Sequence, residues 1–192
     1  MALFVLGDTH LSLGASKPMD IFPGWNDYVE RLEKNWRKLI TPQDTIVLAG
    51  DISWAMRLTD TRKDFAFLQQ LPGQKIIMKG NHDYWWSSLS KMQQRYGAHF
   101  EFLQNDCIMV EDIAVCGTRG WLLPSAESFS DADRKIYNRE GIRLELSLQQ
   151  AHKMQAQQII TVFHYPPLFA RTEHTCFCLL YTSPSPRDRQ KS

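Results

Sequence analysis

The sequence predicts an α/β protein in which strands and helices alternate along the chain. Short apolar runs at residues 3–6, 45–49 and 75–78 have the length of buried strands, and segments with helical spacing of apolar residues separate them. Glycine and polar residues follow each of these runs directly. This is the arrangement expected where the strands of a layered α/β sheet end in functional loops.

In the first part of the chain, residues 3–6 form the first predicted strand, and residues 11–24, which contain two glycines and two prolines, a predicted loop. Apolar side chains at helical spacing predict a helix over residues 25–40. Pro42 would end this helix, and the second strand would follow over residues 45–49.

The pattern then repeats. A helix is predicted over residues 59–71 and would be stopped by Pro72-Gly73. Residues 75–78 form the third predicted strand, and residues 84–96 the next helix. The β-α-β-α-β order indicates parallel strands joined by helices.

Three further short strands are expected over residues 100–103, 107–110 and 113–116. The last two would form a hairpin through a tight turn at Glu111-Asp112.

A long helical pattern covers residues 131–157, in which Gly141 is a candidate for a break or bend. Residues 159–163 form the last predicted strand. No internal repeat is visible, and the length and composition of the chain predict one globular domain.

Four polar clusters follow predicted strands and contain the residue types of a two-metal site. They are Asp8-Thr9-His10, Gly50-Asp51, Gly80-Asn81-His82-Asp83 and His164-Tyr165-Pro166-Pro167. Asp8 and His10 are two residues apart in an expected extended segment, so both side chains would project to one side. Asp51 could offer one carboxylate oxygen to each of two ions. Asn81 and His164 add an amide oxygen and an imidazole, and this mixed set suits manganese, iron or zinc more than calcium.

His82 directly follows Asn81, and adjacent residues on a tight turn rarely bind one ion. We therefore expect His82 to donate a proton to the leaving alkoxide or to stabilise charge on the phosphoryl oxygens. Asp83 would orient the His82 ring and raise its pKa. Gly50 and Gly80 would let the backbone turn sharply and approach the metals without a Cβ.

Simpler explanations exist for each residue alone. A single aspartate in such a cluster is often a turn or helix-capping residue, and His164 could be a core histidine. Arg119 could clamp a substrate phosphate with its planar guanidinium, or could be a surface arginine. The tryptophans near the loops could stack on a base or pack in the core; they are Trp54, Trp85, Trp86 and Trp121.

The four clusters in this order resemble the motifs of the calcineurin-like metallophosphoesterase superfamily, which run D-x-H, G-D, G-N-H-D/E, H and G-H-x-H. The resemblance covers residues 1 to about 170. It implies a four-layer α/β/β/α sandwich with two divalent metal ions between the sheets, and His82 as the acid or transition-state stabiliser. It also implies two ligand sets, Asp8, His10 and Asp51 for one ion and Asp51, Asn81 and His164 for the other.

The last motif of the family, G-H-x-H, is missing from the sequence. The sandwich would then be incomplete at its C-terminus, and each ion would lack one histidine. Residues 178–192 show no apolar periodicity and correspond to the in-frame translation of a common transposon-based sequencing adapter. We therefore expect a metallophosphoesterase domain over residues 1–177 that lacks the G-H-x-H segment, followed by a non-native tail over residues 178–192.

The expected function is hydrolysis of phosphomonoesters or phosphodiesters by an activated water at a dinuclear metal centre, without a covalent enzyme intermediate. Two alternatives belong to other classes. A metal-dependent nuclease would use the same metals, and a non-catalytic binding module could be built on a decayed phosphatase scaffold. The sequence itself names neither the natural substrate nor the oligomeric state.

Composition narrows the choice of partners. The chain has 192 residues, is 43% hydrophobic and 22% charged, and carries a formal net charge of +1. Its lysines and arginines alternate with acidic residues, so there is no strong signal for nucleic-acid binding. The apolar stretches are too short to span a bilayer, and the first residues do not resemble a signal peptide. These features predict a cytoplasmic protein with no membrane partner, and the family resemblance implies a phosphate-ester substrate.

Overall fold

The computed structural model describes residues 1–168 and 175–177, and the chain divides into two compact units, Met1–Leu103 and Gln104–Ser192. The first unit combines a β-sheet with three helices and the second combines a β-sheet with the long helix α4 (Asp131–Lys153), which confirms the predicted α/β class. The stacking of the units into four layers stays a prediction. The expected non-native tail, residues 178–192, lies outside the described residues. Within the described ranges, no helix combines the length and the apolar character needed to cross a membrane.

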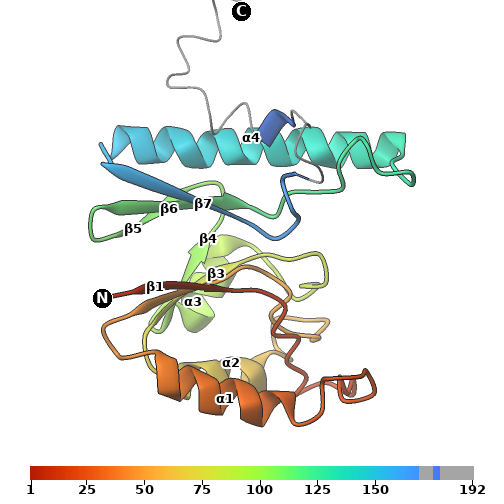
Figure 1. Cartoon of the computed structure of the whole chain (residues 1–192), viewed down its shortest axis with the longest axis vertical. Helices are drawn as coiled ribbons and strands as arrows, with labels where there is room; N and C mark the ends of the chain where they lie inside the picture. Colours follow the sequence, from red (N-terminus) through yellow and green to blue (C-terminus); the bar gives the residue numbers. More distant parts are fainter. Residues whose placement is uncertain (169–174, 178–192) are drawn as a thin grey trace, which may run out of the picture. The chain divides into compact units, whose positions relative to one another are not determined.

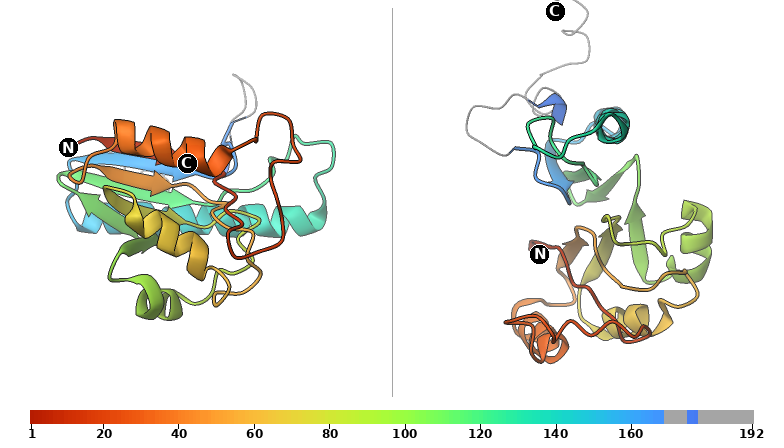
Figure 2. Two further views of the ribbon diagram at one scale, coloured as in Figure 1. Left: turned by 90° about the horizontal axis from the view of Figure 1, so that it is seen from below. Right: turned by 90° about the vertical axis from the view of Figure 1, so that its right-hand side faces the viewer.

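The first unit contains a parallel sheet with strand order β1-β2-β3-β4. Its strands are β1 (Leu3–Leu6), β2 (Thr45–Leu48), β3 (Gln74–Met78) and β4 (Phe100–Leu103), and its helices are α1 (Tyr28–Leu39), α2 (Arg62–Gln70) and α3 (Leu89–Tyr96). The strand order advances in one direction, and parallel crossovers are right-handed, so all three helices lie on one face of the sheet. Figure 1 shows α1 and α2 on this face, and Figure 2 shows the same arrangement from two other sides.

The core of the first unit lies between this face and the helices. Alternate residues of β2 and β3, such as Ile46, Leu48 and Ile77, point to this face and are fully buried. Phe65 and Leu68 of α2 pack against them. Because the strands are anchored along their whole length, the loops at their carboxyl ends start from fixed positions.

All three helices of the first unit begin later than expected. Helix α2 starts at Arg62 rather than at residue 59, and local turns account for the late starts of the other two. Helix α1 starts at Tyr28, because Asp27 has a left-handed backbone with φ of 52°. Helix α3 starts at Leu89 rather than at residue 84, because Tyr84 and Trp86 donate their backbone N–H groups to His82 and Asp83 in tight turns of 2.8 and 3.2 Å. In both places, local turns replace the first helical residues that the apolar spacing suggested.

The second unit contains a three-stranded sheet in the order β5-β6-β7 and one long helix. Its elements are β5 (Cys107–Val110), β6 (Ile113–Thr118), α4 (Asp131–Lys153) and β7 (Gln158–Phe163). The pairing of β5 with β6 is antiparallel, which confirms the predicted hairpin, and β7 adds in parallel to β6. Helix α4 covers one face of this sheet, where Cys116, Leu144 and Ala151 are fully buried (Figure 1).

Gly141 does not interrupt α4, contrary to the bend considered from the sequence. A Cβ at this position would lie 3.3 Å from the Cys176 sulfur, so the glycine allows a close approach on the helix surface. A capping box of Ser130 and Asp133 starts the helix.

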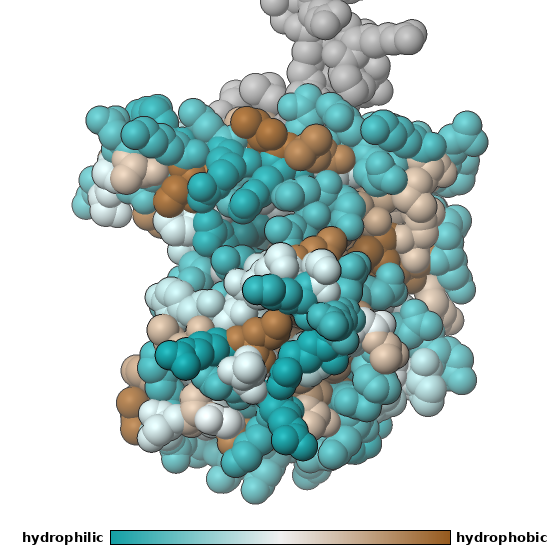
Figure 3. All heavy atoms as spheres, turned by 180° about the vertical axis from the view of Figure 1, so that it is seen from behind, coloured by the Kyte–Doolittle hydropathy of each residue, from teal (hydrophilic) through white to brown (hydrophobic). Residues whose placement is uncertain are grey.

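The exposed large apolar side chains belong to several different elements, including β1, α1 and α4. Figure 3 shows one face of the molecule, on which the apolar (brown) residues form separate patches within a mainly hydrophilic surface. Scattered exposure of this kind is normal for folded proteins and does not by itself mark an interface.

Candidate metal centre

The loops after β1 and β2 run side by side and continue the pairing of the two strands. Asp8 donates its backbone N–H to Gly50 O at 3.0 Å, and His10 donates to Asp51 O at 2.9 Å. Leu11 then donates to Ile52 O at 2.9 Å. These bonds place the first two polar clusters next to each other at the carboxyl ends of their strands, as predicted.

The backbone of these loops is not extended, so the stated reason for pairing Asp8 with His10 was wrong. Asp8, His10 and Asp51 all have positive φ, of 56°, 43° and 53°. Such values are uncommon outside glycine and cost energy that the surrounding structure must supply. The result nevertheless agrees with the prediction, because His10 Nε2 lies 3.5 Å from Asp8 Oδ1 and 3.8 Å from Asp51 Oδ2.

The loop after β3 wraps closely around Asp51. His82 donates its backbone N–H to Asp51 Oδ1 at 2.8 Å. A Cβ on Gly80 would lie 2.1 Å from the same oxygen and 2.2 Å from the Asp51 nitrogen, so only glycine fits. Gly80 thus allows a close approach of the two loops, whereas the predicted approach of its backbone to a metal stays a prediction. Asn81 lies between these two contacts in the chain.

Asp83 has a different role from the one expected. Its carboxylate is fully buried and accepts hydrogen bonds from the backbone N–H groups of Asp51, Ile52 and Gly80 at 2.8, 2.8 and 2.7 Å, and from the Trp85 indole at 2.8 Å. Within the part of the chain that the structure describes, its hydrogen bonds do not include the His82 ring. Asp83 therefore joins the loops after β2 and β3 and does not orient His82. Burial raises the pKa of Asp83, and the backbone donors oppose that shift.

His10 lies in an aromatic setting. Trp54 stacks on its ring with centroids 4.8 Å apart, and Trp25 meets it edge-on at 6.0 Å. The Tyr28 hydroxyl donates to His10 O at 2.9 Å. Burial lowers the pKa of His10, while Asp51 and Asp8 act in the opposite direction. A histidine held neutral in this way is in the form that binds metals.

His82 lies beside the same tryptophan. Its ring centroid is 4.9 Å from Trp54, 6.1 Å from His10 and 6.1 Å from Tyr84. The candidate acid is thus close to the candidate ligand His10. Lys17 lies 4.6 Å above the ring of Trp54, so this tryptophan packs within the site and is not free to stack on a base.

Two residues of this site were missed or left open by the sequence analysis. Asp64 of α2 is fully buried and accepts from Leu13 N at 2.8 Å and from the Ser53 hydroxyl, so it ties both metal-site loops to the helix. Burial raises the pKa of Asp64. It precedes the core residue Leu68 by four positions, on the same face of the helix, and this spacing could have indicated its burial. The second residue is Trp54, for which the sequence left open whether it stacks on a base or packs in the core.

The remaining predicted residues belong to the second unit. His164 directly follows β7, as expected, and its membership of the ligand set stays a prediction. Arg119 is not a surface arginine, because only 14% of its side chain is exposed. Its guanidinium lies 3.5 Å from Glu140 and 4.4 Å from the centre of the Trp121 ring. These contacts favour a packing role over the predicted phosphate clamp.

The residues of the first unit fit a divalent metal. Ligand atoms bound to one ion at roughly 2.0–2.2 Å are roughly 3–4 Å from one another. The separations of His10 Nε2 from the Asp8 and Asp51 oxygens, 3.5 and 3.8 Å, lie in this range. Carboxylates and imidazole together are typical donors for zinc, manganese or iron.

The family model for calcineurin-like phosphoesterases matches residues 1–183. Among solved structures, the chain is similar to a protein of unknown function from Aquifex aeolicus at 19% identity and a TM-score of 0.46, covering 93% of this chain and 86% of that one. No curated protein matches the chain.

Proposed function

The chain belongs to the calcineurin-like phosphoesterase family, and on this premise we propose that it hydrolyses phosphomonoesters or phosphodiesters at a centre of two divalent metal ions. The observation that carries the proposal is the convergence of His10 with Asp8 and Asp51 at ligand-like distances. The loops that hold these residues are kept in strained conformations. Strain of this kind is concentrated at functional sites.

The proposed ligand sets are those that the family resemblance implies. Asp8, His10 and Asp51 hold one ion, and Asp51, Asn81 and His164 hold the other. Asp51 would be shared by the two ions, and its buried position, with 3% of the side chain exposed, would limit competition from water. Manganese, iron and zinc all suit these donors.

When bound, the two ions would neutralise charge on the phosphoryl group and activate the attacking water. The water adds to phosphorus in line with the ester oxygen, and the bond between phosphorus and that oxygen breaks. His82 supplies a proton to the departing alkoxide. Asp83 fixes the backbone on which Asp51 and His82 are mounted, which keeps both groups in place during the reaction.

The test combines metal binding with hydrolysis. Calorimetric titration with Mn²⁺ and hydrolysis of bis(p-nitrophenyl) phosphate would be measured for the chain and for Asp51→Asn. The substitution keeps the size of the side chain and removes its charge. Losing a direct ligand should cost more than the 10- to 100-fold effect of changing a neighbour of a ligand. Asp112→Asn, in the exposed β5–β6 turn, is the matched control and should leave both readouts unchanged.

Equal hydrolysis by Asp51→Asn and Asp112→Asn would refute the proposed bridge. Tight Mn²⁺ binding without hydrolysis of either monoesters or diesters would instead favour the alternative of a non-catalytic binding module. Circular dichroism of the variants would separate these outcomes from a loss of folding.

A further inference from the structure

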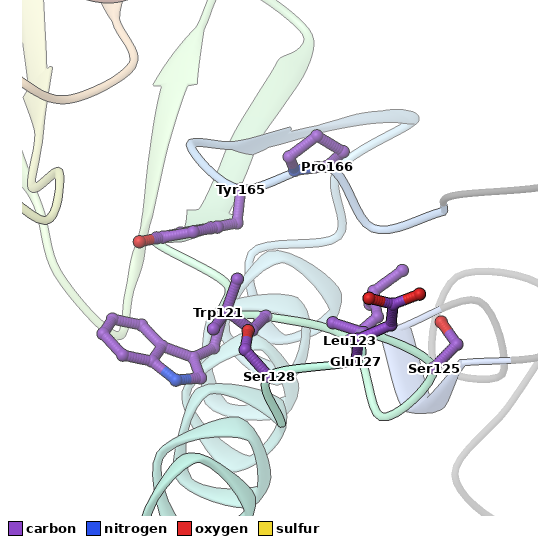
Figure 4. Close-up of a pocket in the computed structure, with 9 residues that line it drawn as sticks. Trp121, Leu123, Ser125, Glu127, Ser128, Tyr165 and Pro166 are labelled. Carbon is purple, nitrogen blue, oxygen red and sulfur yellow. The ribbon is translucent and has the colours of Figure 1, made fainter. Parts of the chain in front are cut away.

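The second unit contains a pocket that the proposed chemistry does not use. Its volume is about 620 Å³, within the usual range for sites that bind small molecules. Figure 4 shows Tyr165 and Pro166 on one side and residues of the loop before α4 on the other. The lining residues are Trp121, Leu122, Leu123, Ser125, Glu127 and Tyr165, with Ala126, Ser128 and Pro166.

The aromatic wall of this pocket is held in place. The Trp121 indole donates to Asp133 Oδ1 at 2.8 Å, and the Arg119 guanidinium covers its ring at 4.4 Å. Tyr165 donates its backbone N–H to Arg119 O at 2.8 Å, and its ring lies 5.2 Å from that of Trp121. A wall fixed before binding lowers the entropic cost of taking up a flat ligand.

The charge of the pocket points to the kind of ligand. Among the lining residues that the structure describes, Glu127 is the one carboxylate, and none is a lysine or an arginine. A phosphate would therefore be repelled. Within residues 1–168 and 175–177, no hydrogen bond or ion pair engages the Glu127 carboxylate, which leaves it available to accept N–H groups. The pocket suits an uncharged, planar group that carries N–H donors.

The position of the pocket connects it with the proposed reaction. Tyr165 directly follows His164, and the centroids of their rings are 5.4 Å apart. His164 is one of the proposed metal ligands, so this step rests on the proposed function. A phosphoester whose phosphate is bound beside His164 would have its organic group within reach of Tyr165.

We propose that this pocket binds the organic group of the phosphoester, and that this group is a nitrogen heterocycle of the nucleobase type. Its flat face lies against the aromatic wall of Trp121 and Tyr165, and its N–H groups donate to Glu127. Any base can stack on aromatic side chains, whereas the Glu127 carboxylate would favour bases that have N–H donors on their edge.

Binding of adenosine tests the pocket without any phosphate chemistry. Calorimetry would compare the full chain with Ala126→Phe, which fills the pocket, and with Ala132→Phe, which adds the same ring at an exposed position of α4. Ala126→Phe should abolish adenosine binding, and Ala132→Phe should preserve it. Glu127→Gln should lower the affinity for adenosine about tenfold, because a hydrogen bond to a charged acceptor is lost. Benzyl alcohol has no N–H donor, so its affinity should be the same for this variant and for the wild-type chain.

Each result is informative. Adenosine affinity that is the same in Ala126→Phe and Ala132→Phe would overturn the inference, as would an adenosine affinity that Glu127→Gln leaves intact. Failure of the wild-type chain to bind adenosine while it still hydrolyses bis(p-nitrophenyl) phosphate would overturn the pocket assignment alone. Adenosine binding without any metal-dependent hydrolysis would overturn the proposed function and leave the pocket as a heterocycle site.

Discussion

The buried carboxylate of Asp83 accepts a hydrogen bond from the backbone N–H of Asp51 at 2.8 Å. It accepts others from Ile52 and Gly80, so one side chain joins the loops that follow β2 and β3. Asp83 thus fixes the backbone of Asp51, the proposed bridging ligand, without itself having to contact a metal. Asp51 is thus a proposed ligand and Asp83 a positioning residue. Substitution of one should therefore have a different effect from substitution of the other.

Asp83→Asn should destabilise the first unit as well as weaken its metal site. An amide offers one oxygen in place of two, and its NH₂ group would face backbone donors. Leaving such donors unsatisfied in a buried place costs about 3 kcal/mol in the free energy of unfolding. Urea unfolding without metal would measure this loss. Asp112→Asn, which is exposed, serves as the control, and equal midpoints for the two variants would contradict the clamp.

Gly80→Ala should prevent formation of the metal site, because the added Cβ would lie 2.1 Å from Asp51 Oδ1. Gly7→Ala is a matched control immediately before Asp8. A Cβ there would have no neighbour closer than 4.0 Å. Mn²⁺ titration should show a loss of more than roughly 100-fold for Gly80→Ala, since the position of a direct ligand changes, and little change for Gly7→Ala. Similar affinities for both variants would be inconsistent with the close packing of the two loops.

Much of the fold could be predicted from the sequence, because the elements differ clearly in local pattern. The four strands of the first unit end within one residue of their predicted ends, since apolar runs stop where polar loops begin. The starts of α1 and α3 could not be predicted in this way. They depend on the left-handed conformation of Asp27 and on turns at His82 and Asp83. Such turns compete with helix formation only once the loops are folded together.

The candidate ligands could be predicted for a similar reason. The buried carboxylates that hold their loops in place, Asp83 and Asp64, could not. Asp8, His10 and Asp51 follow strands directly, so their positions are set by neighbours in sequence. Besides the nearby donors Gly80 and Trp85 of Asp83, the partners of Asp83 and Asp64 include backbone and hydroxyl groups from 11 to 51 residues away in the chain. No local pattern shows which N–H groups a buried carboxylate will meet, because that depends on how the loops are brought together.

Trp54→Leu should weaken metal binding without a matching loss of stability. Trp54 stacks on His10 at 4.8 Å and contacts His82 at 4.9 Å, so it limits the movement of one ligand and of the candidate acid. A change next to a ligand typically costs 10- to 100-fold in affinity. Trp86→Leu is the control, because Trp86 packs against Phe102 in the core. Mn²⁺ titration should be affected by the first variant and urea unfolding chiefly by the second. The reverse pattern would show that Trp54 serves the core rather than the site.

Lys75 should make the stability of the first unit depend on pH. Its side chain is buried in β3, where the ammonium donates to Leu71 O, and burial lowers the pKa of Lys75 to about 8 from an ordinary 10.5. Between these values the unfolded chain binds more protons than the folded chain, so the free energy of unfolding rises as pH increases. The expected gain between pH 7 and 10 is roughly 2 kcal/mol.

Lys75→Met keeps the length of the side chain and removes the titration. Urea unfolding would give the free energy of unfolding of both proteins at several pH values. Subtracting one curve from the other removes the contribution of all other titrating groups. The difference in the free energy of unfolding between the two proteins should narrow steadily above pH 8, because Lys75 of the folded wild-type chain loses its buried charge and the variant has no charge to lose. A difference that is constant from pH 7 to 10 would mean that Lys75 keeps its proton in the folded state, and that the bond to Leu71 O compensates for its burial.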